Sequence, residues 1–158
     1  MLYLSSGLPL WAGLVGWAAY TGMQGAPAPL KQTIAATTAG IVVGWCAEVL
    51  AHLIPVPPDT WLWIPRAALA VAVTLPLLLL TVRWRLSDNI FPALSGYGAV
   101  FAALASPPVN QTNLQRLTGL HLSNPIVLMT ISMALGVLSG WLEGRLEAAL
   151  RREHQPTD

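Results

Sequence analysis

Long apolar runs, separated by short polar or proline-containing stretches, dominate this chain. None of the runs alternates between apolar and polar residues with the period of two that is typical of a strand. Each is also longer than the roughly 9–11 residues of a strand in a membrane barrel. A segment in lipid can satisfy its own backbone hydrogen bonds only as a helix. The pattern therefore predicts an all-α membrane protein with about five transmembrane helices, at residues 2–23, 33–54, 61–82, 90–105 and 125–142.

Charged residues are scarce and lie between the apolar runs. They make up 9% of the 158 residues, whereas a soluble domain carries about 25%. No charged residue precedes Lys31, and none lies between Asp88 and Arg116 or between Arg116 and Glu143. The net charge of +1 provides no basic surface that would attract phosphate. The composition excludes a water-soluble enzyme, a disordered chain and a nucleic-acid-binding protein, and it indicates that the lipid bilayer is the chain's main partner.

The basic residues between the runs predict the orientation, because cytoplasmic loops of membrane proteins are enriched in Lys and Arg. With a cytoplasmic C-terminus, six of the eight basic residues lie on the inner side, and only Arg66 and Arg116 lie outside. Five spans then place the N-terminus and the loop at residues 55–60 outside. We expect residues 1–150 to form a single transmembrane domain and residues 151–158 to form a short cytoplasmic tail.

Comparison of the chain with itself reveals an internal repeat. A displacement of 80 residues places Gly16 on Gly96, and a displacement of 96 places the hexamer that begins at Gly40 on the one that begins at Gly136. The first and fourth runs are predicted to cross the membrane in opposite directions, as are the second and fifth. The predicted repeat therefore has inverted topology, as in many secondary transporters. In such proteins, short segments interrupted by Gly or Pro, like the first and fourth runs, indicate a central solute site.

Each hexamer contains two glycines that are four residues apart. Small residues at this spacing let two membrane helices approach closely. We interpret all four as helix-packing residues: Gly40, Gly44, Gly136 and Gly140. The sequence leaves open whether the partner helix belongs to the same chain or to another copy. Because five short spans provide little mass to enclose a pore, we expect a homo-oligomer.

Glu48 is the residue within the runs that most strongly indicates a function. A carboxylate in a membrane span is costly and is a functional-site hypothesis by default. His52, four residues later, shares its helix face, and Trp45 is on the same side. Glu48 could bind a cation, relay a proton or hydrogen-bond a solute; the alternative is a Glu–His pair that reaches outward to the interface. Further solute-path candidates lie in the two short runs: Gly16, Ser95, Gly96 and Tyr97.

No grouping in the sequence is typical of a catalytic centre or a metal site. The three histidines are scattered, Cys46 is the single cysteine, and neither a Ser–His–Asp arrangement nor a phosphate-binding loop can be recognised. The repeat places Gly144 opposite Glu48, which argues against a symmetric pair of acidic ligands. We therefore expect no catalytic residue, no metal and no cofactor, and we expect that the protein is not an enzyme.

The stretch from Trp11 to Tyr20, followed by Leu30-Lys31, resembles small bacterial inner-membrane proteins of the domain of unknown function 1097 family. Residues 91–102 and 136–141 are similar to later segments of that family in the same order. The resemblance implies a location in the bacterial inner membrane. It also implies a three-plus-three arrangement of spans, of which this sequence contains all but the first. It implies no biochemical activity.

Together these features favour a transporter or channel. The near absence of charge within the runs indicates a small solute that is neutral or weakly cationic rather than a large anion. The alternative is a non-catalytic accessory subunit that packs against a larger membrane complex, since the apolar composition and the glycine faces suit that role equally well. A homo-oligomer is expected in the first case, and foreign subunits are expected in the second.

Overall fold

The computed structural model describes residues 9–22, 30–54, 63–85, 89–104, 117–119 and 124–153. These parts contain five helices and no strand, which confirms the predicted all-helical fold. The loop at residues 55–60, the first eight residues and the last five lie outside the described residues, as do His121 and His154. The helices are α2 (Leu10–Thr21), α3 (Leu30–Leu53), α4 (Trp63–Arg85), α5 (Phe91–Leu104) and α7 (Pro125–Glu153).

Three of these helices are long and apolar enough to cross a membrane. The qualifying stretches of α3, α4 and α7 have mean hydropathies of 1.7, 1.7 and 1.8. In contrast, α2 and α5 have only 12 and 14 residues. At about 1.5 Å per residue, each is shorter than the hydrocarbon core of about 30 Å. In the described part of the chain, the five predicted runs thus correspond to three long apolar helices and two short ones, α2 and α5, which lie in the two runs predicted to be short.

Proline and asparagine residues explain where several helices begin. Pro9 has an extended ψ of 114° directly before α2, which therefore begins at Leu10. Asn124 precedes α7, and its Oδ1 accepts a hydrogen bond from the Ile126 amide at 3.0 Å. Pro125 then occupies the first helical position, where the missing amide costs nothing. Asn89 similarly accepts a hydrogen bond from the Phe91 amide at the start of α5.

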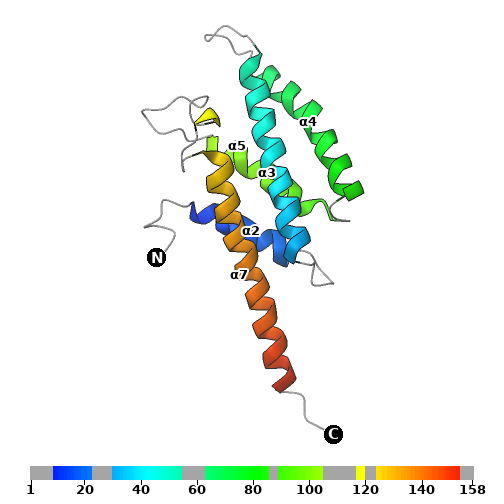
Figure 1. Ribbon diagram of the computed structural model, residues 1–158, viewed down its shortest axis with the longest axis vertical. Coiled ribbons are helices and arrows are strands. Elements are labelled where there is room, and N and C mark those ends of the chain that lie inside the picture. The colour runs from blue at the N-terminus through cyan, green and yellow to red at the C-terminus, as the bar shows by residue number, and fades with distance from the viewer. Residues whose placement is uncertain are drawn as a thin grey trace.

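The long helices α3 and α7 run in opposite directions, and the short helices cross them (Figure 1). α2 makes its most extensive contacts with α7, and α5 makes its most extensive contacts with α3. The two short helices also run in opposite directions. α4 runs antiparallel to α3 and packs against its side, away from α7 (Figure 1). The part of α7 beyond Leu142 extends away from the other helices and is exposed, as expected for a solvated extension.

Two hydrophobic clusters hold the helices together. The central cluster joins α2, α3, α5, α7 and Leu117, and includes the fully buried side chains of Ile41, Val100 and Met133. The α4 cluster joins Leu78 and Val82 of α4 to α3 and α5. Alanines make up half of the buried residues of the α4 cluster, whereas Leu, Met, Ile and Val predominate in the central cluster.

Candidate functional site

Glycines bring α3 and α5 into backbone contact. Gly40 of α3 lies against the carbonyl of Ala93, and Gly96 of α5 lies against the carbonyl of Thr37. A Cβ atom at either glycine would overlap with that carbonyl oxygen. The two helices can therefore hold this separation only with glycine at both positions.

The contact between α2 and α7 has the same construction. Gly136 of α7 lies against the carbonyl of Gly13, and Gly16 of α2 lies against the carbonyl of Met133. Here too, a Cβ atom at Gly16 or Gly136 would overlap with the facing oxygen. The expected packing role of Gly136 thus agrees with its position, and so does that of Gly40 in the other contact.

The displacements of 80 and 96 residues place the residues of one contact on those of the other. The corresponding pairs are Gly40–Ala93 with Gly136–Gly13, and Gly96–Thr37 with Gly16–Met133. The second glycines of the two hexamers, however, have different neighbours. Gly44 lies against the backbone of Tyr97, whereas Gly140 lies against the side chains of Trp17 and Tyr20. The two contacts are therefore equivalent in position but not in every neighbour.

Gly16 and Gly96, two of the solute-path candidates, lie at these helix contacts. Both residues are buried, and the space beside each is filled by backbone of the facing helix. The sequence reading rested on their position in short, glycine-containing segments. That same feature allows close packing, and the packing accounts for both glycines.

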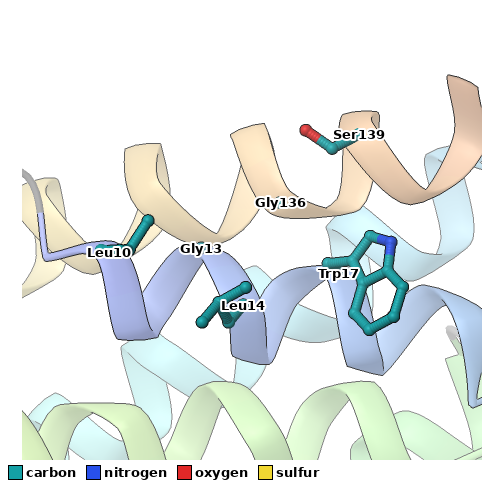
Figure 2. Close-up of a pocket in the computed structure, with 6 residues that line it drawn as sticks. All are labelled: Leu10, Gly13, Leu14, Trp17, Gly136 and Ser139. Atoms are coloured by element: carbon teal, nitrogen blue, oxygen red, sulfur yellow. The ribbon is translucent and has the colours of Figure 1, made fainter. Parts of the chain in front are cut away.

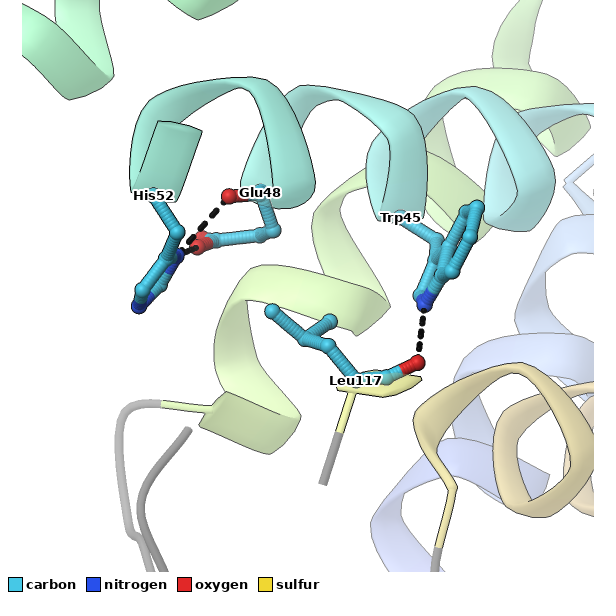
Figure 3. Close-up of polar contacts among 4 residues, drawn as sticks. All are labelled: Trp45, Glu48, His52 and Leu117. Atoms are coloured by element: carbon cyan, nitrogen blue, oxygen red, sulfur yellow. Dashed lines mark hydrogen bonds and ion pairs between the residues drawn. The ribbon is translucent and has the colours of Figure 1, made fainter. Parts of the chain in front are cut away.

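Glu48 and His52 form a pair near the end of α3 (Figure 3). The Nδ1 atom of His52 donates a hydrogen bond to the backbone carbonyl of Glu48 at 2.8 Å, and it lies 3.9 Å from the Glu48 carboxylate. The Glu48 side chain is only 16% exposed, and that of His52 is 21% exposed. Because the histidine proton is directed to the backbone, the Glu48 carboxylate keeps oxygen lone pairs available for another partner.

Glu48 interacts electrostatically with residues of two other helices. Arg66 of α4 attracts its negative charge, and this charge in turn acts on the Tyr97 hydroxyl of α5. The Arg66 Nε atom is buried and has no hydrogen-bond partner among the described residues. Residues of α3, α4 and α5 are thus within electrostatic range of the Glu48 carboxylate. The sequence reading did not include Arg66, because its position beside Glu48 depends on how α4 packs on α3.

Trp45 connects α3 to the segment before α7. Its Nε1 atom donates a hydrogen bond to the Leu117 carbonyl at 2.9 Å (Figure 3). The Asn124 amide donates to the same carbonyl at 3.2 Å and to the Gly119 carbonyl at 2.9 Å. The sequence reading missed Asn124, although an Asn-Pro pair before an apolar run is a recognised signal for a helix start. Trp45 therefore has a fixed structural partner beside the Glu48 pair.

The remaining solute-path candidates, Tyr97 and Ser95, lie on α5. The Tyr97 side chain is nearly buried, and its hydroxyl lies 2.9 Å from the Thr74 hydroxyl of α4. Its ring packs on Phe101 with the ring centroids 5.1 Å apart. Ser95 instead donates a hydrogen bond to the Phe91 carbonyl of its own helix. The structure therefore brings Tyr97 near Glu48, whereas Ser95 is satisfied locally.

Buried hydroxyl groups on both long helices are a further polar feature. They have no hydrogen-bond partner among the described residues, although buried polar groups normally have one. Threonine and serine are common in membrane helices, so no sequence signal distinguished these positions. The four residues are Thr33 and Thr37 of α3, and Thr130 and Ser132 of α7.

A groove of about 260 Å³ lies between α2 and α7. Figure 2 shows its lining of apolar side chains and glycines: Leu10, Gly13, Leu14, Trp17, Gly136 and Ser139. The Trp17 Nε1 atom donates a hydrogen bond to the Glu143 carboxylate at 2.6 Å. The Ser139 hydroxyl donates to the Leu135 carbonyl of its own helix. The groove is therefore an apolar surface whose polar atoms already have partners.

Three polar side chains, those of Glu48, His52 and Arg66, define the chemistry at this end of α3. Within the described residues, no three His, Cys, Asp or Glu side chains lie close enough to hold a metal ion. The available chemistry is one carboxylate, one imidazole and one guanidinium, with a tyrosine nearby. Such a group can form hydrogen bonds or ion pairs with a small solute.

Comparison with known proteins places the chain in a family. The family model described as "Protein of unknown function (DUF1097)" matches residues 1–148. No curated protein and no solved structure matches the chain. The match covers all five described helices except the last turns of α7, and it agrees with the family to which the sequence motifs pointed. The chain therefore belongs to the DUF1097 family.

Proposed function

We propose that the protein is a polytopic membrane protein that transports or conducts a small neutral or weakly cationic solute. The apolar helices α3, α4 and α7 cross the bilayer. The bacterial inner membrane is the proposed location, with a cytoplasmic C-terminus, in accordance with the distribution of basic residues. In this orientation Trp17 and Glu143 lie near the inner surface, and Glu48 lies toward the outer one.

The main support for this proposal is that each short helix packs on the long helix of the other half of the repeat. α2 packs on α7, whereas α5 packs on α3, with glycines at corresponding positions in both contacts. The antiparallel directions of α3 and α7, and of α2 and α5, fit a two-fold axis in the membrane plane (Figure 1). We interpret the repeat as one of inverted topology, an architecture in which the solute site lies between the repeats.

The two short helices support a polar path in the bilayer. Helices of 12 and 14 residues that lie inside a membrane end before its surfaces. The backbone groups at such ends have to face other protein groups or a polar cavity. The buried hydroxyls of α3 and α7 lie on the helices that α2 and α5 cross. A neutral solute that donates and accepts hydrogen bonds can satisfy groups of this kind.

We propose that the solute contacts Glu48 near the outer surface of the membrane. Its carboxylate is largely buried, and its neighbours Arg66 and His52 prevent an isolated negative charge in the bilayer. A weakly cationic solute can share the carboxylate with these groups, and a neutral one can donate a hydrogen bond to it. The proposed assembly is a homo-oligomer, because one copy has few spans with which to enclose a path.

The test is a flux measurement in liposomes that contain the purified full-length chain. Urea and glycerol serve as neutral probes, and methylammonium serves as the cationic one. We expect flux above that of protein-free liposomes for at least one probe, and a loss of at least tenfold in Glu48→Gln. Glu147→Gln is the matched control, because that carboxylate is exposed and pairs only with Arg151. If neither class of probe crosses faster than in protein-free liposomes, the transport proposal is wrong.

A second function, that of a non-catalytic accessory subunit, is favoured by one specific observation. The groove between α2 and α7 is apolar and open among the described residues, and large apolar side chains line it. Such a surface suits contact with a larger membrane complex. Native mass spectrometry in mild detergent separates the two functions. It detects only copies of this chain in the first case and stoichiometric foreign subunits in the second.

A further inference from the structure

We propose that Thr33 and Thr37 of α3 form a second binding position for a small neutral solute, on the inner side of α5. This inference deepens the transport function proposed above and rests on it. The two residues are only 1% and 3% exposed, and neither hydroxyl has a hydrogen-bond partner among the described residues. Leaving a buried hydroxyl unpartnered costs free energy. Two such groups one helical turn apart indicate a partner that can bond to both.

Other hydroxyls of the described helices are satisfied locally. The hydroxyls of Thr74, Thr81 and Ser95 each donate to the carbonyl four residues earlier, at 2.8, 2.8 and 2.9 Å. Serine and threonine within a helix commonly bond in this way. Thr37 has the Thr33 carbonyl at the same spacing but does not bond to it. Its hydroxyl therefore remains available for a group outside its own helix.

The repeat shows that helix packing does not require hydroxyls at these two positions. The displacement of 96 residues places Thr33 on Met129, and it places Thr37 on Met133. Both methionines are buried in the central cluster. Apolar side chains thus fit the corresponding positions of α7. Packing alone does not explain the hydroxyls of α3, whereas a bound solute does.

Both threonines share a face of α3 with Glu48. At about 100° per residue, Thr33, Thr37 and Glu48 fall within a sector of about 60° around the helix axis. Gly44 lies in the same sector, between Thr37 and Glu48. This face therefore has hydroxyls toward its inner end and a carboxylate toward its outer end, in the orientation proposed above.

The short helix α5 separates these two polar positions. It crosses α3 (Figure 1), and the carbonyls of Ala93 and Tyr97 lie against two glycines of α3 that come between Thr37 and Glu48. Contact between backbones leaves no space for a solute between the two helices. The solute can therefore pass from one position to the other only when α5 moves relative to α3, and the structure represents the closed state of this face.

The chemistry of the inner position favours a neutral solute. A hydroxyl both donates and accepts hydrogen bonds, so a solute with both kinds of group, such as urea or glycerol, can bond to Thr33 and Thr37. A full positive charge within the bilayer needs a carboxylate nearby, and α3 has none between Thr33 and Glu48. We therefore expect the inner position to discriminate against cations more strongly than the Glu48 position does.

The first test measures access to the inner position and needs no solute flux. In the full chain with Cys46→Ala, Thr37→Cys is compared with Ala36→Cys, because Ala36 is equally buried but belongs to the apolar α4 cluster. The thiol reagents are 2-hydroxyethyl and 2-aminoethyl methanethiosulfonate, which have nearly the same size and differ in charge. Each rate is divided by the rate of the same reagent with a free thiol in water.

We expect the neutral reagent to modify Thr37→Cys at least tenfold faster than Ala36→Cys. For the cationic reagent, this ratio of rates should be at least threefold smaller. Equal rates at the two positions would show that the threonines never meet a polar molecule and would overturn the proposal. Equal ratios for the two reagents would show water access without preference for a neutral group, and would overturn it as well.

A second measurement uses the liposome flux of urea and glycerol. The double variant Thr33→Val/Thr37→Val should lower this flux at least tenfold. The matched control Thr81→Val should not, because Thr81 is exposed on α4 and bonded within its helix. Unchanged flux in the double variant, or flux of methylammonium alone in the original chain, would overturn this inference but not transport. If the original chain conducts no probe, transport is wrong, and the thiol rates alone decide whether the inner position binds a neutral molecule.

Discussion

The contact of α5 with α3 and the contact of α2 with α7 have the same glycine positions but different surroundings. In both, two glycines lie against carbonyls of the facing helix. The α3–α5 contact is covered by α4 and lies beside Glu48, whereas the α2–α7 contact is open on the corresponding side. The comparison separates two roles. Glycine-mediated packing is common to both halves, whereas the covering helix and the acidic residue belong to one half.

This difference extends to the residues next to the Glu48 pair. Ala47, near Glu48 on α3, is buried against α4, but its counterpart on α7 is the exposed Glu143. Glu48 itself corresponds to Gly144, which has open space around its Cα among the described residues. An inverted repeat with identical halves would have a symmetric path. Here the Glu48 pair and its neighbour Arg66 belong to the covered half, whereas unpartnered buried hydroxyls occur in both halves among the described residues.

The largest effect is expected from Gly40→Ala and Gly136→Ala, because a Cβ atom at either position overlaps with backbone of the facing helix. Backbone cannot move away as a side chain can, so we expect each substitution to cost about 3 kcal/mol or more. Thermal unfolding in detergent, followed by circular dichroism, measures the loss. Equal losses would support equivalent contacts; a large loss in only one of them would break the equivalence.

Gly98→Ala and Gly144→Ala are the matched controls on α5 and α7. A Cβ atom at either position meets nothing within 4 Å among the described residues. Alanine also has the higher helix propensity, by about 1 kcal/mol in a soluble helix. Both variants should therefore be as stable as the original chain or more stable.

A smaller effect distinguishes the second glycines of the two hexamers. A Cβ atom on Gly44 would lie 2.8 Å from the Tyr97 carbonyl oxygen, whereas one on Gly140 would lie 3.1 Å from the Tyr20 ring. A ring on an exposed surface can move and a helix backbone cannot. Gly44→Ala should therefore cost about 1–3 kcal/mol and Gly140→Ala less than about 1 kcal/mol. Equal midpoints in the same unfolding assay would contradict this difference.

The helical fold and the glycine contacts could be predicted from the sequence, because length, hydropathy and spacing encode them directly. The displacements of 80 and 96 residues aligned Gly16 with Gly96 and Gly40 with Gly136, and the structure places these residues in corresponding contacts. The start of the first predicted run lies outside the described residues, and the described helix α2 begins at Leu10, directly after Pro9.

The surroundings of the Glu48 pair could not be predicted for a different reason. In a soluble helix, the apolar stripe indicates which face is buried. A membrane helix is apolar on all sides, so α4 gives no such indication, and its position on α3 rather than α7 is not encoded in its hydropathy. Arg66 and Thr74 consequently remained unassigned until their neighbours were known.

The smallest effect concerns the polar contacts at the two equivalent aromatic residues. Tyr97→Phe removes a hydroxyl that lies 2.9 Å from the Thr74 hydroxyl in the covered half. Hydrogen bonds between membrane helices contribute about 0.6 kcal/mol on average, so we expect a loss of this size. Glu143→Ala removes the acceptor of Trp17 in the open half, where both groups are exposed and water can replace the carboxylate.

We therefore expect a small but measurable decrease in the unfolding midpoint for Tyr97→Phe and none for Glu143→Ala. Thr74→Val should reproduce the effect of Tyr97→Phe, and the double variant should lose little more than either single one, because both remove the same bond. A larger loss for Glu143→Ala than for Tyr97→Phe would mean that the open half is held together more tightly than its exposure indicates. The Trp17–Glu143 hydrogen bond would then contribute more to the packing of α2 on α7 than the Tyr97–Thr74 bond contributes to the packing of α4 on α5.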